Sequence, residues 1–220
     1  MHLTTVIFDM DGLLIDSEPL WKEAAQEIFG QYNIVLNDAQ YLSTTGLRTR
    51  EFVSWWFAKH KINEREYSIA EDKILKSVMQ KVQERGKVMT GVKYIFDFFR
   101  EQNFKIGIAS SSSTPLINLV VEMLGLQESL HAIESAEALL YGKPHPEVYL
   151  NCAKALGSKP TECICFEDSF NGMIAVLAAR MQCVVVPSYH QYKEERWSAA
   201  NLKLSSLQNF NQLHLNLLES

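Results

Sequence analysis

The sequence predicts an α/β fold: a Rossmann-like, doubly wound parallel sheet that carries an inserted, all-helical cap domain. Three observations lead to this prediction. Short apolar runs alternate along the chain with amphipathic stretches of helical length. After the first run, residues 17–86 carry only helical patterns. The chain has 220 residues, of which 47% are hydrophobic and 21% charged, enough for one sizeable globular domain with a smaller insertion.

Five short runs predict the strands of the sheet: Leu3–Phe8, Phe104–Ala109, Ala132–Glu134, Cys163–Phe166 and Cys183–Pro187. Between them, apolar residues recur every three or four positions and predict helices over Gly91–Gln102, Thr114–Leu124, Pro146–Leu156 and Asn171–Met181. Strands joined by helices pair in parallel through right-handed crossovers, so we expect a sheet with helices on both faces.

The stretch after the first strand predicts a separate helical unit. Its patterns cover Glu18–Phe29, Arg48–His60 and Glu64–Gln83. Ser17 is a suitable N-cap for the first of these helices, with Pro19 in the first turn. We therefore expect a core domain of residues 1–16 and 87–220, and a cap domain of residues 17–86.

Charge and composition exclude several classes of partner. The chain has 21 Lys and Arg residues against 26 Asp and Glu, a net charge of −5. This balance argues against a nucleic acid or an anionic membrane, since either would select a basic face. No apolar window of about 18 residues predicts a membrane span, and no basic leader precedes an apolar stretch. We expect a cytoplasmic protein, monomeric because a core of this size needs no partner.

Cysteine usage agrees with a reducing compartment. Four cysteines are too few for a disulfide scaffold. The sequence contains no Cys-x-x-Cys pair, so it does not predict a zinc site. We expect these residues to be small buried hydrophobes.

Polar residues follow four of the predicted strands or their connections. Each set alone has an ordinary structural explanation: acidic pairs and serines cap turns and helices, and a single lysine is usually solvated. Ligands of open parallel sheets bind beyond the carboxyl ends of the strands, however, so groups from several strand ends would meet there. The candidates are Asp9, Asp11, Ser110, Ser111, Lys143, Glu167 and Asp168.

The order Asp-x-Asp, Ser, Lys, Glu-Asp resembles the haloacid dehalogenase superfamily. The similarity extends over the whole chain through FDMDGLLIDSE, the helical insertion, IASSSS, GKPHPEVY and FEDSFNG. The local sequence is similar to the branch of β-phosphoglucomutase-like and 2-deoxyglucose-6-phosphatase-type sugar phosphatases. This resemblance implies a Mg²⁺-dependent phosphatase for small phosphorylated metabolites, with hexose or deoxyhexose phosphates expected, acting through an aspartyl-phosphate.

The resemblance also implies roles for the residues. Asp9 would be the nucleophile, and Asp11 the general acid and base. Mg²⁺ would be held by the Asp9 carboxylate, the Asp11 backbone carbonyl and Asp168, with Glu167 in support. The phosphoryl oxygens would contact Ser110, the backbone at Ser111 and the Lys143 ammonium.

The cap departs from part of the family pattern. Trp21 stands where the mutases carry a histidine, and an indole cannot transfer a proton; it could line the substrate site or pack in the cap. The stretch around Gly46 resembles the specificity loop of the cap, where glycine permits close approach. Arg48 or Arg50 would then contact a sugar hydroxyl or a second anionic group, unless solvated.

Three other functions remain open from the sequence. A β-phosphoglucomutase-like isomerase would interconvert glucose phosphates, and Trp21 weighs against it. A phosphonate hydrolase would need a cap lysine for an imine, and Lys22 does not match that position. A non-catalytic sugar-phosphate sensor would bind without turnover, although every chemical position holds a competent residue.

Overall fold

The computed structural model describes residues 2–220 and shows a six-stranded, all-parallel sheet in the order β3-β2-β1-β4-β5-β6. The chain moves from β1 to one edge, returns beside β1 as β4, and moves to the other edge. A switch point of this kind lies between β1 and β4, and ligands of open α/β sheets bind there. The strands are β1 (Thr5–Phe8), β2 (Lys105–Ser110), β3 (Ala132–Ser135), β4 (Cys163–Glu167), β5 (Gln182–Val185) and β6 (Leu202–Lys203).

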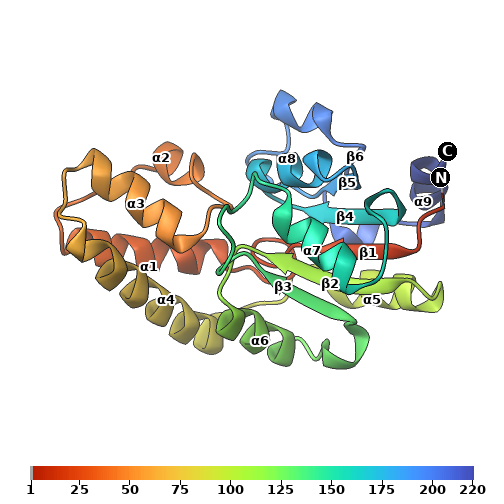
Figure 1. Ribbon diagram of the computed structural model, residues 1–220, viewed down its shortest axis with the longest axis horizontal. Coiled ribbons are helices and arrows are strands. Elements are labelled where there is room, and N and C mark those ends of the chain that lie inside the picture. Colours follow the sequence, from red (N-terminus) through yellow and green to blue (C-terminus); the bar gives the residue numbers. More distant parts are fainter. Residues whose placement is uncertain (1) are drawn as a thin grey trace.

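Helices cover both faces of this sheet, as a doubly wound fold requires (Figure 1). Successive strand residues point to opposite faces, so Val6 and Phe8 of β1 join one apolar cluster and Ile7 joins another. The first cluster includes α5, α6 and α9, and the second includes α7 and α8. These helices are α5 (Val92–Glu101), α6 (Thr114–Met123), α7 (Glu147–Ala155), α8 (Phe170–Ala178) and α9 (Gln212–Glu219).

Aromatic rings pack beneath the central strands. The ring of Phe8 stacks on Phe96 at 4.8 Å and on Phe166 at 5.1 Å between centroids. Phe99 meets Phe8, Phe166 and Phe210 at 5.5 to 6.2 Å. Phe8 precedes Asp9, so this packing fixes the end of β1 from which that carboxylate emerges.

The remaining helices form a bundle beyond one end of the sheet, opposite both chain termini (Figure 1). They are α1 (Glu18–Gly30), α2 (Asp38–Leu42), α3 (Thr49–Lys59) and α4 (Arg65–Arg85), and all fall within the insertion expected from the sequence. Two extended segments join them to the sheet, and the Met89 amide donates to the Leu14 carbonyl at 2.9 Å where these segments meet.

The fold class predicted from the sequence is confirmed. The five predicted strands and seven predicted helices are present, with ends within three residues of those expected. The sequence interpretation missed α2, β6 and α9, which are short. Ser17 occupies the N-cap position of α1, but its hydroxyl makes no bond to the helix and donates to Asp11 instead.

Two further expectations concern the whole chain. The four cysteines are buried and carry free thiols. Within residues 2–220, no helix combines the length and the apolar character that crossing a bilayer demands.

Candidate active site

Strand register brings the candidate residues together at one edge of the sheet. Phe8 of β1 lies beside Ile108 of β2 and Phe166 of β4, so the residues that follow these positions are neighbours. The Asp9 amide continues the ladder by donating to the Phe166 carbonyl at 3.0 Å. The carboxyl end of β1 therefore places Asp9 between the serines after β2 and the acidic pair after β4.

Lys143 forms a buried ion cluster with two of these acids. Its side chain is 2% exposed, and its ammonium donates to Asp9, to Glu167 at 2.6 Å and to the Ala109 carbonyl at 3.1 Å. Burial alone would lower the pKa of Lys143, but the charges of Asp9 and Glu167 outweigh it and raise that pKa above its ordinary value. Lys143 is therefore a fixed cation.

Glu167 is held from every side. Its Oε1 accepts hydrogen bonds from Lys143 and from the Tyr149 hydroxyl at 2.5 Å. Its Oε2 accepts from the Asp168 amide and from the amide and hydroxyl of Ser169, each at 3.1 Å. These five bonds occupy the lone pairs of the carboxylate, so Glu167 orients its neighbours and is poorly placed to be a direct metal ligand.

The residues present fit a divalent cation. Asp9 and Asp168 each offer a carboxylate oxygen, and an oxygen of the hydrogen-bonded Glu167 lies with them, the three atoms being within 4.8 Å of one another. Burial, opposed in part by Lys143, raises the pKa of Asp9 well above its usual value; burial and the charge of Asp9 do the same at Asp168. Three carboxylates, two of them buried, near one ammonium leave a surplus of negative charge that a hard cation such as Mg²⁺ would neutralise.

Gly12 makes room for Asp168. Its φ is +75°, in the left-handed region that favours glycine, and a Cβ at this position would lie 2.1 Å from Oδ2 of Asp168. The turn after β1 can therefore approach the acidic cluster only because residue 12 has no side chain.

The Asp11 carboxylate is oriented by three donors. Oδ1 accepts from the Ser17 hydroxyl at 2.6 Å and from the Trp21 indole nitrogen at 2.9 Å, and Oδ2 accepts from the Ser112 hydroxyl at 2.6 Å. Two of these donors, Ser17 and Trp21, lie at the start of the insertion and one on the core, so Asp11 connects the two parts at the site. Trp21 thus acts as a partner of the second aspartate.

The serines after β2 also meet the insertion. The hydroxyl of Ser110 accepts from the Ser112 amide at 3.1 Å, and the Ser111 hydroxyl donates to the Gly46 carbonyl at 2.9 Å. Gly46 has a φ of +84°, and a Cβ there would come within 2.7 Å of the Ser169 hydroxyl. The backbone at Gly46 therefore approaches the Ser169 side chain closely, and a role of Gly46 toward a substrate stays a prediction.

Two arginines of the same loop fasten it to the core. Arg48 is buried, and its guanidinium donates to the carbonyls of Ala136 at 3.1 Å and Leu139 at 2.5 Å and pairs with Glu51. Arg50 donates to the Leu139 carbonyl at 2.6 Å. Both side chains thus bind the loop after β3 rather than the space above Asp9.

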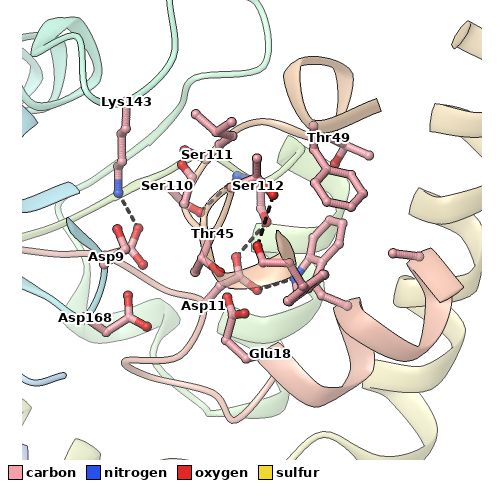
Figure 2. Close-up of a pocket in the computed structure, with 18 of the residues that line it drawn as sticks. Asp9, Asp11, Glu18, Thr45, Thr49, Ser110, Ser111, Ser112, Lys143 and Asp168 are labelled. Atoms are coloured by element: carbon pink, nitrogen blue, oxygen red, sulfur yellow. Dashed lines mark hydrogen bonds and ion pairs between the residues drawn. The ribbon is translucent and has the colours of Figure 1, made fainter. Parts of the chain in front are cut away.

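A cavity lies between the strand ends and the helical insertion, where ligands of open α/β sheets bind. Figure 2 shows Asp9, Asp168 and Lys143 on one side of it, with Asp11, Glu18 and Thr45 among the other residues that line it. Of the residues predicted for the site, eight line this cavity: Asp9, Asp11, Trp21, Gly46, Ser110, Ser111, Lys143 and Asp168.

Other residues of the site were not found from the sequence. Glu18 and Thr45 line the cavity, Ser112 binds Asp11, and Tyr149 binds Glu167. Glu18, Ser112 and Tyr149 lie inside motifs quoted for the family resemblance, which was the available signal. Their roles depend on side-chain direction, which sequence spacing does not give.

Comparison with known proteins gives the site its context. The model of the haloacid dehalogenase-like hydrolases matches residues 6–186, most of the chain and every strand-end motif described above. The chain belongs to this family. The family resemblance noted in the sequence is confirmed, including the α/β core that the family shares.

Named relatives agree with this assignment. The chain is 39% identical to hexitol phosphatase B of Escherichia coli O157:H7, over 94% of this chain and 93% of that protein. It is 26% identical to fructose-1-phosphate phosphatase YqaB of Escherichia coli K12, over 82% of this chain and 95% of that protein. The structure of β-phosphoglucomutase from Clostridium difficile shares the fold, with a TM-score of 0.85, 24% identity, and coverage of 98% of this chain and 96% of that one.

These findings confirm the predicted enzyme class. The protein is a hydrolase of the sugar-phosphatase-like branch and acts on phosphoric monoesters. The family match and the relatives that are named phosphatases both support this class.

Proposed function

We propose that this protein is a Mg²⁺-dependent phosphatase that hydrolyses hexose, deoxyhexose or hexitol monophosphates through an aspartyl-phosphate. The observation that carries the proposal is the cluster of Asp9, Lys143, Glu167 and Asp168 at the strand ends, beside a cavity that Asp9, Asp11, Lys143 and Asp168 line. Phosphoryl transfer depends mainly on positioning and charge neutralisation, and this cluster supplies both.

Two aspartates divide the chemistry. An oxygen of Asp9 attacks the phosphorus, the bond from phosphorus to the sugar oxygen breaks, and Asp11 gives that oxygen its proton. Asp11 then takes a proton from the water that attacks the phosphorus of the aspartyl-phosphate, which releases phosphate and restores Asp9. The hydrogen bonds from Ser17, Trp21 and Ser112 hold Asp11 for both transfers.

Mg²⁺ would be held by the carboxylates of Asp9 and Asp168 and by the backbone carbonyl of Asp11, and it would neutralise charge on the phosphoryl oxygens. Glu167 would support this set by orienting Asp168 and Lys143. Ser110, the backbone at Ser111, and Lys143 would bind the remaining phosphoryl oxygens.

Residues 17–86 would act as the cap domain over residues 1–16 and 87–220. The contacts from Gly46, Arg48 and Arg50 to the core support a closed arrangement that excludes bulk water from the intermediate. The hexitol and fructose-1-phosphate phosphatases named above support a phosphorylated polyol or sugar as the substrate. Monomeric state and cytoplasmic location stay predictions from the sequence.

The test is phosphate release from a panel of hexose, deoxyhexose, hexitol and nucleotide monophosphates, and from p-nitrophenyl phosphate, with and without Mg²⁺. We expect release that requires Mg²⁺, is lost in Asp9→Asn, and is retained in Asp72→Asn, which changes an exposed aspartate of α4. Acid quenching with ³²P-labelled substrate should leave label on the protein that hydroxylamine removes.

Activity that survives in Asp9→Asn would contradict the nucleophile. Conversion of glucose 1-phosphate to glucose 6-phosphate with a bisphosphate activator, faster than phosphate release, would favour the isomerase instead. Tight binding of sugar phosphates with no release across the panel would favour the sensor.

A further inference from the structure

The cap side of the cavity differs sharply from its floor in charge. Among the residues 2–220 that line the cavity, Lys143 is the single lysine, arginine or histidine, and it is already paired with Asp9 and Glu167. The two arginines of the specificity loop are directed to the loop after β3. A second anionic group on a substrate would therefore find no cation on the cap side.

Glu18 adds a negative group at that place. It lies in the first turn of α1 and lines the same cavity as Asp11 (Figure 2), and its carboxylate makes no hydrogen bond or ion pair within the described part of the chain. A carboxylate without a cation is costly to keep in a pocket unless a ligand satisfies it. The groups that satisfy it are hydrogen-bond donors such as hydroxyls, whereas a carboxylate or phosphate on the ligand would repel it.

Thr45 points to the same kind of ligand. Its Oγ1 is buried and has no hydrogen-bond partner among residues 2–220, although the residue lines the cavity. Its neighbour Thr44 also lines the cavity, but the Thr44 hydroxyl already donates to the Tyr41 carbonyl and accepts from the Trp56 indole nitrogen. The Thr45 hydroxyl is thus an unused donor and acceptor in the cavity that Glu18 and Asp11 also line (Figure 2).

We propose that Glu18 and Thr45 form a hydroxyl-binding subsite that restricts this enzyme to substrates whose only anionic group is the phosphate being removed. This inference rests on the proposed phosphatase function and adds to it the class of substrate body: a neutral, hydroxylated carbon chain. Glu18 accepts a hydrogen bond from a substrate hydroxyl, and Thr45 contributes a second contact. Bisphosphates and phosphorylated sugar acids are excluded because their second anion meets Glu18.

Two six-carbon monophosphates that differ in one group test whether the subsite rejects a second anion. Sorbitol 6-phosphate and 6-phosphogluconate differ at the end remote from the phosphate, where one has a hydroxymethyl group and the other a carboxylate. At pH 8 with Mg²⁺ we expect the wild type to favour sorbitol 6-phosphate in kcat/KM by about a hundredfold, and Glu18→Gln to reduce that preference about tenfold. Glu27→Gln, an exposed change in the same helix, should leave the preference unaltered.

Thr45→Val keeps the side-chain volume and removes the hydroxyl. We expect kcat/KM for sorbitol 6-phosphate to fall about tenfold, with little change for p-nitrophenyl phosphate, whose body has no hydroxyl to lose. Equal rates for the two six-carbon substrates in the wild type, or an equal change for both in Glu18→Gln, would overturn the proposal.

Failure of the phosphatase proposal would appear differently. In that case no compound, p-nitrophenyl phosphate included, releases phosphate. The ratio of the two dissociation constants, measured by calorimetry on the wild type and on Glu18→Gln, then decides the subsite: a preference for sorbitol 6-phosphate that weakens in the variant supports it, and an unchanged ratio contradicts it.

Discussion

Replacing Glu18 by glutamine should stabilise the folded protein at alkaline pH. Burial, together with the charges of Asp11 and Asp16, raises the pKa of Glu18 from 4.5 to about 7. At 1.36 kcal/mol per pKa unit, this difference amounts to roughly 3 kcal/mol between the folded and unfolded states. The carboxyl therefore costs stability in return for its place in the site, and an uncharged isostere removes that cost.

The direction of the stability change follows from whether the folded or the unfolded state ionises at the lower pH. Below pH 4.5 the carboxyl is protonated in both states and has no effect. As the pH rises from 4.5 to about 7, the unfolded chain ionises before the folded one, so folding stability is progressively lost. We expect the variant to exceed the wild type in free energy of unfolding by about 1 kcal/mol at pH 5 and about 3 kcal/mol at pH 8.

Urea denaturation followed by tryptophan fluorescence at pH 5 and pH 8, in the presence of a chelator, measures this difference. The hydrogen bonds of the glutamine side chain also affect stability, but that effect does not depend on pH. The quantity to measure is therefore how much the stability difference between variant and wild type grows from pH 5 to pH 8. Glu122→Gln, which changes an exposed glutamate of α6 outside this cavity, should show no such growth. An equal difference at both pH values, or a variant that is less stable than the wild type at pH 8, would refute the reasoning.

Three further substitutions test the site geometry. Gly12→Ala places a Cβ 2.1 Å from Asp168 at a positive φ, so the Mg²⁺ concentration for half-maximal activity should rise at least about tenfold; an unchanged Mg²⁺ titration would contradict this. Trp21→Phe removes one donor to Asp11, and kcat should fall about tenfold with little change in KM, whereas an effect on KM alone would make Trp21 a substrate contact. Arg48→Ala removes the bonds to Ala136 and Leu139, so phosphate release should slow and KM rise as the cap opens; limited proteolysis should cut the loop after β3 faster, and equal cleavage would exclude that attachment.

Much of the fold could be predicted because its signals are local. Each core strand is a short apolar run, and each long helix repeats its apolar residues at helical spacing, so element type and order were readable. The elements that were missed are those whose stability comes from contacts elsewhere. Strand β6 has two residues and exists through its pairing with β5, and α9 is a short helix whose leucines pack against the core cluster.

The residues of the candidate site likewise fall into those that the sequence could identify and those whose orientation it could not. Asp9, Ser110 and Asp168 could be assigned because they follow strands of one parallel sheet, and parallel register brings the ends of its strands to one edge. Arg48 illustrates the limit. Its position in the cap loop suggested a ligand for the substrate, but its side chain turns to the loop after β3, and sequence spacing carries no information on that direction.

The sequence by itself determined the family, the doubly wound sheet and the inserted helices, and it singled out the acidic, serine and lysine positions of the candidate site, since these depend on periodicity and on order along the chain. The tertiary structure decided which groups are free to meet a substrate. Hydrogen bonds between residues far apart in sequence occupy Glu167, Lys143, Arg48 and Asp11, whereas the Glu18 carboxylate and the Thr45 hydroxyl have no partner among residues 2–220. Such pairing depends on distances across the closed site, which no local pattern encodes.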